Sequence, residues 1–316
     1  MLSPVAAAYG YVSERHMLKS PRYRAPVPVL CIGNFVVGGA GKTPTALAVA
    51  ALAASEGLVP GFLTRGYGGT SAGPLAVDLD RHNPDLVGDE ALLLARRAPT
   101  VVARQRHLGV EPLIDAGVTI LIMDDGMQNP VLAKDLSLAV IDAAAGLGNG
   151  QILPAGPLRA PIAAQFARTD ALVVVGAGSA ADRVIREAER AAKPVLIAAL
   201  RPRAPAPRQR RLLAFAGIGR PEKFFATLRD SGGEIADAIP FPDHHKYSAR
   251  DAEGLLRRAD AEDLQLITTE KDASRLGGRE GVLAALAARA VPFAVDLVFA
   301  DPAAASALLR AVPKAR

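Results

Sequence analysis

Apolar runs between residues 27 and 200 predict strands that are buried on both faces. The runs are Val27–Ile32, Val59–Thr64, Thr100–Ala103, Val118–Met123, Leu136–Ile141, Ala171–Val175 and Val195–Leu200. They are nearly continuously apolar and lack a regular alternation with polar residues, as parallel strands packed between two layers require. Helical patterns separate them at Thr43–Ser55, Gly88–Arg97, Leu108–Ala116 and Ala180–Ala192. This alternation predicts an α/β fold with a doubly wound, mostly parallel sheet between helices.

A Pro- and Arg-rich stretch at residues 201–211, RPRAPAPRQRR, interrupts the alternation and is typical of a linker. Beyond it the pattern resumes, with strands at Leu212–Ala216, Leu264–Thr268 and Val291–Val298 and helices at Pro221–Ser231, Ala249–Ala259, Gly281–Ala288 and Ala303–Val312. We therefore expect an N-terminal segment over residues 1–24, a main α/β/α lobe over 25–205 and a second, smaller α/β/α lobe over 206–316.

Composition narrows the class of protein. The chain has 316 residues, 50% of them hydrophobic, and carries a formal net charge of +5. This length suits about two domains, and the positive charge suits a phosphate, an acidic lipid surface or nucleic acid. The single cysteine, Cys31, excludes an internal disulfide and a cysteine-based zinc cluster and fits a reducing cytoplasm. With no tryptophan and 4% aromatic residues, base stacking on single-stranded nucleic acid is not expected.

The first residues form a candidate amphipathic helix, Leu2–Leu18, followed by the basic side chains of Lys19, Arg22 and Arg24. We expect neither a membrane-spanning helix, which needs about 20 apolar residues, nor a signal peptide, because the basic residues follow the apolar part. Two interpretations stay open. The helix packs on the body of the protein, or its apolar face dips into a membrane while the basic segment meets anionic head groups.

A strand, a glycine-rich loop and a helix follow one another at residues 27–55. The loop residues are Val36, Val37, Gly38, Gly39, Ala40, Gly41, Lys42 and Thr43. Glycines allow backbone N–H groups to surround phosphate oxygens, and the helix N-terminus adds partial positive charge. In such a P-loop Lys42 would reach the β- and γ-phosphates and the Thr43 hydroxyl would hold Mg²⁺. The usual pattern has glycine where this chain has Val36, and a glycine turn without ligand is the alternative.

Two carboxylates, Asp124 and Asp125, follow the apolar run that ends at Met123. Carboxyl ends of parallel strands meet at one sheet edge, so these side chains are expected beside the phosphate loop as metal ligands. Solvated turn aspartates are the alternative. A second glycine-rich segment, residues 176–181 (GAGSAA), fits a dinucleotide-binding pattern. The strand after it ends in Arg201 and offers no acid for a ribose hydroxyl, which disfavours that function.

Several short motifs occur in one order along residues 5 to 276. Besides the phosphate loop, they are RGYGG at 65–69, VGDE at 87–90, DDGMQ at 124–128, GNG at 148–150, LPAGPLR at 153–159, Asp243-His244 and TTEKD at 268–272. Together they resemble the tetraacyldisaccharide 4′-kinase family, the lipid A 4′-kinases of Gram-negative bacteria. Two positions depart from the family pattern: Asn129 stands where histidine is usual, and Ala160 where glutamate is usual.

The resemblance implies two α/β/α lobes and transfer of the ATP γ-phosphate to the 4′-hydroxyl of a tetraacylated glucosamine disaccharide 1-phosphate. It also implies a peripheral protein on the cytoplasmic face of the inner membrane, with no protein partner evident. Asp89 resembles the family's candidate base and His244 the partner of that aspartate, while a carboxylate beside an attacking hydroxyl suits phosphoryl transfer. Asp89 as an ordinary helix N-cap stays open. Arg65, at a strand end, is a candidate phosphate contact or a surface arginine.

Particular residues bear on three other interpretations of the sequence. A P-loop switch or partitioning ATPase usually has lysine where this chain has Val37. A small-molecule kinase or amide-forming ligase on the same fold would not need a membrane-binding N-terminus. A metal site built on His244 and His245 would need a distant third ligand, because the chain has only five histidines.

Overall fold

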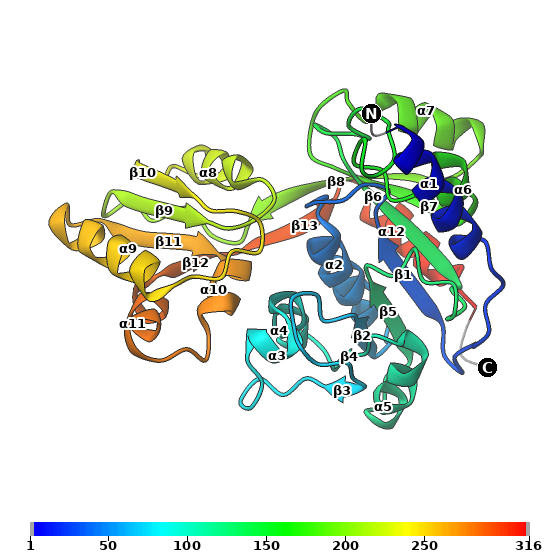
Figure 1. The fold of residues 1–316 in the computed structure, drawn as a ribbon, viewed down its shortest axis with the longest axis horizontal. Helices are drawn as coiled ribbons and strands as arrows, with labels where there is room; N and C mark the ends of the chain where they lie inside the picture. Colours follow the sequence, from blue (N-terminus) through cyan, green and yellow to red (C-terminus); the bar gives the residue numbers. More distant parts are fainter. Residues whose placement is uncertain (1–2, 314–316) are drawn as a thin grey trace.

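Two β-sheets, each covered by helices, organise the chain, and the computed structural model describes residues 3–313 (Figure 1). Within these residues the large sheet has nine strands in the order β13-β8-β7-β6-β1-β5-β2-β4-β3, and the small sheet has the order β10-β9-β11-β12. The strands of the large sheet are β1 (Val29–Gly33), β2 (Pro60–Thr64), β3 (Leu75–Ala76), β4 (Thr100–Val102), β5 (Ile120–Asp124), β6 (Leu136–Asp142), β7 (Ala171–Val175), β8 (Val195–Pro202) and β13 (Val295–Phe299). Those of the small sheet are β9 (Leu212–Ala216), β10 (Ile235–Pro240), β11 (Gln265–Thr269) and β12 (Val291–Phe293).

Helices connect and cover these strands. They are α1 (Ser3–Met17), α2 (Lys42–Ser55), α3 (Pro84–Val87), α4 (Asp89–Ala95), the 3-10 helix η1 (Arg106–Gly109), α5 (Val110–Asp115), α6 (Ile162–Ala167), α7 (Asp182–Arg190), α8 (Pro221–Asp230), α9 (Ala249–Ala261), α10 (Glu270–Leu276), α11 (Gly281–Arg289) and α12 (Pro302–Arg310). The predicted α/β fold with a large, mostly parallel sheet and a second, smaller lobe is confirmed.

The centre of the large sheet is parallel, and this arrangement brings the functional loops to one edge. Strand β1 pairs in parallel with β5 on one side and β6 on the other, with Ile32 opposite Asp124. All five residues of β1 and all five of β5 are buried, because helices cover both faces. The loop after β1 and the end of β5 therefore lie next to each other at the carboxyl edge of the sheet.

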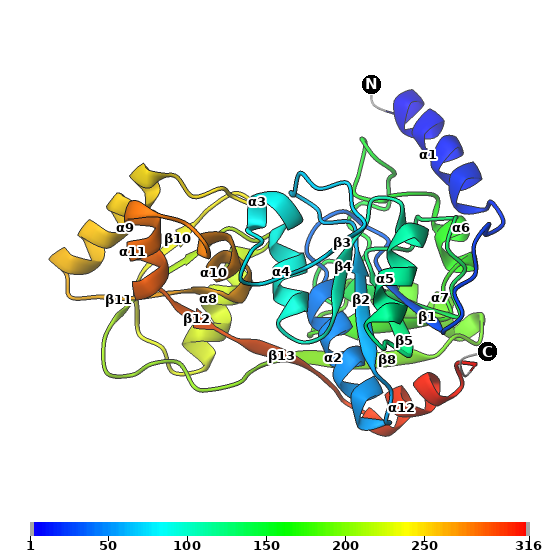
Figure 2. The same ribbon diagram turned by 90° about the horizontal axis from the view of Figure 1, so that it is seen from below.

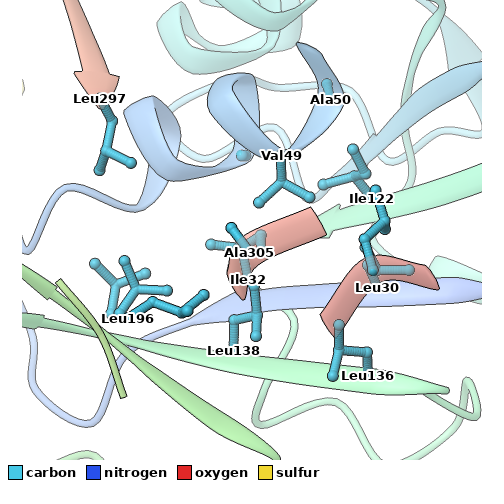
Figure 3. Packing of buried hydrophobic residues seen from close by; sticks show 14 of the residues in the cluster. Leu30, Ile32, Val49, Ala50, Ile122, Leu136, Leu138, Leu196, Leu297 and Ala305 are labelled. Carbon is cyan, nitrogen blue, oxygen red and sulfur yellow. The ribbon is translucent and has the colours of Figure 1, made fainter. Parts of the chain in front are cut away.

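Helix α2 packs closely on this sheet because its buried side chains are small. Ala46 and Ala50 are almost fully buried, and Figure 3 shows Val49 and Ala50 facing Ile32 and Ile122 of the central strands. Small side chains at this contact let the helix backbone approach the strands. The packing fixes the direction of α2, whose first two residues, Lys42 and Thr43, are the last two of the phosphate loop.

The C-terminal end of the chain returns to the main lobe, so the expected boundary of 206–316 for the smaller lobe is wrong. The predicted strand Val291–Val298 is two strands: β12 joins the small sheet, while β13 pairs antiparallel with β8. In β13 Leu297 and Phe299 are buried and Val298 is exposed, which suits an edge strand. The mostly apolar sequence of residues 291–298 hid this break. Helix α12 then packs on the main core through Ala305 and Leu309.

Two crossing segments therefore join the lobes (Figures 1 and 2). Strand β8 extends to Pro202, which lies opposite Val295 of β13, so the first residues of the predicted linker are in a strand. Next to this pair, the Arg203 guanidinium contacts Asp296 at 2.6 Å and Glu270 at 3.1 Å. The segment after Pro202 leads to β9 without further regular structure up to residue 211.

Helix α1 lies along the main lobe and presents two different faces. Ala6 and Met17 are buried, and Gly10 packs against Ile152 and Pro161. Val5 and Val12 are 57% and 65% exposed. Leu2, the first residue of the predicted helix, lies outside the described residues. Within residues 3–313, no helix combines the length and apolar character needed to cross a bilayer.

Candidate active site

The phosphate loop joins β1 to α2 and has the backbone that its glycines permit. Gly38 and Gly41 have φ angles of 102° and 92°, in the left-handed region that favours glycine. Val36 is outside this region, which explains why a side chain is tolerated where the common pattern has glycine. Thr43 follows Lys42 in the first turn of α2, and Pro44 costs nothing there because the first N–H groups of a helix have no intrahelical partner.

A second loop, LPAGPLR at 153–159, supports the phosphate loop from the side. The Val37 N–H donates to the Pro157 carbonyl at 2.9 Å, and Arg159 Nε donates to the Val36 carbonyl at 3.2 Å. Both Nη atoms of Arg159 also contact the Asp125 carboxylate, at 3.0 and 3.1 Å. Arg159 thus ties the loop after β5 to the loop after β1.

Lys42 lies between the phosphate loop and the end of β5. Its Nζ is 3.3 Å from the Asn34 side-chain oxygen and 3.9 Å from Asp125 Oδ1. Asn34 is fully buried and donates from Nδ2 to the Gly38 carbonyl at 3.3 Å. Both contacts of the Lys42 ammonium group are long. The group is therefore held inside the loop and is still able to bind phosphate oxygens.

Asp124 is buried, and its carboxylate is unpaired within the described part of the chain. It is 1% exposed, and neither carboxylate oxygen accepts a hydrogen bond from any residue between 3 and 313. Burial, followed by the nearby charges of Glu90 and Asp125, raises the pKa of Asp124 to about 7. An unpaired carboxylate in such a place is costly unless a cation neutralises it. Together with the buried Thr43 hydroxyl, this donor set fits Mg²⁺, which prefers hard oxygen ligands from one or two protein groups.

The predicted pair of Asp89 and His244 comes together from the two lobes. Asp89 is the first residue of α4 in the main lobe, and His244 follows β10 in the smaller one. His244 Nδ1 is 3.6 Å from Asp89 Oδ2, and the His244 ring packs beside Tyr67, with 4.9 Å between ring centroids. His245 points elsewhere, to Asp251 at 3.0 Å, so the adjacent histidines do not face one site.

The charges around Asp89 keep it ionised. Burial opposes ionisation of this carboxylate, which is 4% exposed, but His244, Arg275 and Lys271 outweigh burial and hold its pKa well below the usual range. In return the Asp89 carboxylate raises the pKa of His244 above its usual 6.5. Each of the two groups therefore favours the charged form of the other.

Helix α10 supplies contacts that the sequence reasoning missed. Lys271 Nζ is 2.5 Å from Glu90 Oε1, and Arg275 Nε is 2.7 Å from Asp89 Oδ2. Glu90 Oε1 also accepts a hydrogen bond of 3.4 Å from the Thr43 hydroxyl. The TTEKD motif contained a usable signal, because Thr269 with Asp272 three residues later has the pattern of a helix start, and the Thr269 side chain does cap α10.

The remaining predicted residue, Arg65, follows β2 at the same sheet edge. Its side chain is exposed, and no ion pair to it occurs in the described part of the chain. The structure thus brings together the phosphate loop, Asp124, Asp125, Asp89 and His244. Arg65 lies at the rim, where its predicted contact with phosphate stays a prediction.

Comparisons with known proteins identify the family of this chain. The model of the family described as Tetraacyldisaccharide-1-P 4'-kinase matches residues 1–313. A Tetraacyldisaccharide 4'-kinase of Methylobacterium radiotolerans is 56% identical over 275 residues, which cover 87% of this chain and 84% of that protein. The protein of the same name from Agrobacterium fabrum is 48% identical over 310 residues, covering 98% and 89% of the two chains.

A solved structure supports the fold independently. The crystal structure of LpxK from Aquifex aeolicus in complex with ATP matches with a TM-score of 0.74 over 98% of both chains, at 24% identity. This likeness concerns the fold, including both lobes. Because the family model spans nearly the whole chain and relatives share about half of its residues, the chain belongs to the tetraacyldisaccharide 4′-kinase family.

Proposed function

We propose that the junction between the two lobes is where this chain carries out the reaction of its family. The chain is a lipid-sugar kinase of lipid A biosynthesis that phosphorylates the 4′-hydroxyl of tetraacyldisaccharide 1-phosphate. One observation carries the assignment of the site: the phosphate loop with Lys42 and the unpaired Asp124 lies in one lobe next to Asp89, which His244 of the other lobe faces.

For the nucleotide, we propose residues 36–43 as the phosphate cradle. Backbone N–H groups of the glycine-rich turn and the N-terminus of α2 would bind the phosphate oxygens, and Lys42 would neutralise charge on the β- and γ-phosphates. Thr43 and Asp124 are the proposed holders of Mg²⁺, which supplies further charge neutralisation when bound. Asp125, predicted as a ligand as well, is engaged by Arg159, so we assign it to positioning Lys42 and Arg159.

For the acceptor, Asp89 is the proposed group that orients the 4′-hydroxyl. The hydroxyl oxygen forms a bond to the γ-phosphorus while the bond from that phosphorus to the bridging oxygen of ADP breaks, and the hydroxyl proton passes to the Asp89 carboxylate. Because the pKa of Asp89 is low, it is ionised and able to accept a hydrogen bond at every physiological pH. A weak base suffices where the transition state is loose and the proton leaves late. His244 faces this carboxylate, with Nδ1 3.6 Å from Asp89 Oδ2, and helps to hold it in place.

For access to a substrate with four acyl chains, we propose peripheral contact of α1 with the cytoplasmic face of the inner membrane. Val5, Tyr9 and Val12 lie at helical spacing and are all more than 40% exposed, away from the face of Ala6 and Gly10 that packs on the body. Lys19, Arg22 and Arg24 follow the helix and are exposed. An apolar stripe next to basic residues suits an anionic membrane surface. Packing of α1 on the body of the protein and contact of its exposed face with a membrane are thus compatible.

Product analysis tests the proposal. The purified full chain is incubated with ATP, Mg²⁺ and the acylated disaccharide 1-phosphate, and products are examined by mass spectrometry and by phosphorus–proton NMR correlation. We expect one added phosphate, attached at the 4′-oxygen, and its loss when a chelator removes Mg²⁺. Transfer that continues at the parent rate in the Lys42→Ala variant would show that the cradle lies elsewhere.

A further inference from the structure

A buried arginine of the smaller lobe, Arg275, connects both members of the Asp89–His244 pair. Its Nε donates to Asp89 Oδ2 at 2.7 Å, and its Nη1 donates to the Gly217 carbonyl at 2.5 Å. The same Gly217 carbonyl accepts the backbone N–H of His244 at 3.0 Å. One guanidinium group therefore contacts the carboxylate directly and the histidine loop through a shared carbonyl.

The guanidinium is itself held rigidly. Asp272, which is fully buried, contacts Arg275 Nη1 at 2.6 Å and also accepts hydrogen bonds from the Tyr247 hydroxyl at 2.9 Å and the Gly217 N–H at 3.1 Å. Arg275 is 7% exposed. A planar group fixed at several points sets the direction of its remaining donors, which lysine in its place would not do.

Arg275 also carries a cost that packing alone does not justify. Its Nη2 is buried and has no hydrogen-bond partner among residues 3–313. Buried donors are nearly always paired, and a buried arginine that served only to join the lobes would be better replaced by apolar side chains. The peripheral contact between Arg279 and Asp85 joins the same lobes with a half-exposed pair.

We infer that Arg275 is a positioning residue for phosphoryl transfer: docking of the smaller lobe places its guanidinium on Asp89 and, through Gly217, aligns His244 with the same carboxylate. The inference rests on the proposed role of Asp89. The groups that face the Asp89 carboxylate are Arg275, Lys271 and His244 from the smaller lobe and its own neighbour Glu90, whose N–H donates to Asp89 Oδ1 at 3.0 Å. Asp89 Oδ2 is the oxygen that meets both Arg275 and His244.

The test compares Arg275→Met with Arg279→Met in the full chain, using the acylated disaccharide and Mg²⁺-ATP. We expect kcat of Arg275→Met to fall about 100-fold, the loss typical of a misplaced reacting group. The KM for ATP should change little, since Arg275 does not touch the phosphate loop. The acid limb of its kcat/KM profile should move upward by about one to three pH units, because an aspartate that loses an adjacent arginine is more easily protonated. Arg279→Met should keep the parent kcat and profile.

Combining Arg275→Met with Asp89→Asn tests whether Arg275 affects the rate through Asp89. If Arg275 acts through Asp89, the second substitution should cost little more in kcat. A purely structural role would instead lower kcat equally in both backgrounds and leave the acid limb in place, which would overturn the inference. Equal losses in Arg275→Met and Arg279→Met would overturn it too. If Asp89→Asn alone kept the activity of the parent, the proposed role of Asp89 would be refuted. This outcome concerns the proposed function, and the single variant distinguishes it from a failure of the inference about Arg275.

A second variant guards against misfolding. If Arg275→Met does not give a folded protein by circular dichroism, Arg275→Lys keeps the positive charge and loses the several-point geometry. We then expect Arg275→Lys to have a lower kcat than the parent, while the acid limb of its kcat/KM profile stays at the same pH as in the parent. A lysine variant with the full parent kcat would show that charge alone is needed and would contradict the positioning role.

Discussion

Charging the exposed stripe of α1 is a perturbation whose effect can be worked out from the structure. In the folded protein Val5 and Val12 are 57% and 65% exposed, so Val5→Asp and Val12→Asp remove little packing. Surface changes of this kind usually alter the free energy of unfolding by about 0.5 kcal/mol or less. The expected consequence therefore concerns the membrane and not the fold.

The loss of membrane affinity follows from burial and charge. Full burial of a valine side chain contributes about 1.5 kcal/mol. Because somewhat more than half of each side chain is exposed, replacing each valine removes about 1 kcal/mol of apolar burial at the membrane. Each new carboxylate adds about 1 kcal/mol of repulsion from an anionic surface. For both positions together we expect about 4 kcal/mol, on the order of a 10³-fold weaker partition onto vesicles.

The assay measures co-sedimentation with vesicles that contain phosphatidylglycerol, and phosphorylation of acceptor either carried in those vesicles or dispersed in detergent. The double variant should leave the vesicles and lose activity there, with a much smaller loss in detergent. Val59→Asp with Val298→Asp makes the same chemical change at valines that are 45% and 48% exposed and belong to other elements, directly before β2 and within β13. This control variant should bind like the parent. Equal losses in vesicles and detergent would mean that α1 serves only the fold, and the membrane contact would then be refuted.

Three further outcomes are expected. Lys42→Ala should abolish transfer while leaving the melting temperature close to that of the parent, because the contacts of its ammonium group within residues 3–313 are two long ones, to Asn34 and Asp125; a large fall in melting temperature would assign it to the fold. Asp124→Asn should lower Mg²⁺-dependent activity at least about 100-fold and, by removing an unpaired buried charge, raise thermal stability without metal, whereas a lower melting temperature would contradict the unpaired state. Asp89→Asn should lower the free energy of unfolding by about 2 kcal/mol at pH 7. Since folding lowers the pKa of Asp89, that difference should be complete above about pH 4 and shrink as the pH falls below it, which denaturant titrations at pH 7 and pH 3 would check.

Much of the main lobe was predictable because its signals are local. The buried strands are mostly apolar, and the phosphate loop shows its glycines and Lys42 in one short segment. The end of β5 could be placed beside this loop because parallel strands share a carboxyl edge, and Ile32 does lie opposite Asp124. Local pattern plus one rule of topology was enough.

The parts that sequence reasoning missed depend on contacts between distant segments. Arg275 reaches Asp89 across 186 residues of sequence and Lys271 reaches Glu90 across 181, and no spacing rule connects such pairs. The return of β13 to the large sheet depends likewise on pairing with β8 and not on its own composition. Asp125 looked equivalent to Asp124 in sequence, but the structure separates them: one is paired with Arg159 and the other has no partner in the described residues.

A single-turnover measurement tests the central claim most directly. The full chain, preloaded with ATP labelled in its γ-phosphate and with Mg²⁺, is mixed with excess acylated disaccharide, and label in the disaccharide is followed over time for the parent and for Asp89→Asn. We expect the parent to transfer its label to the 4′-oxygen in one exponential phase. Asp89→Asn should bind ATP as the parent does and transfer the label at least about 100-fold more slowly. Transfer by Asp89→Asn at the parent rate would contradict the account.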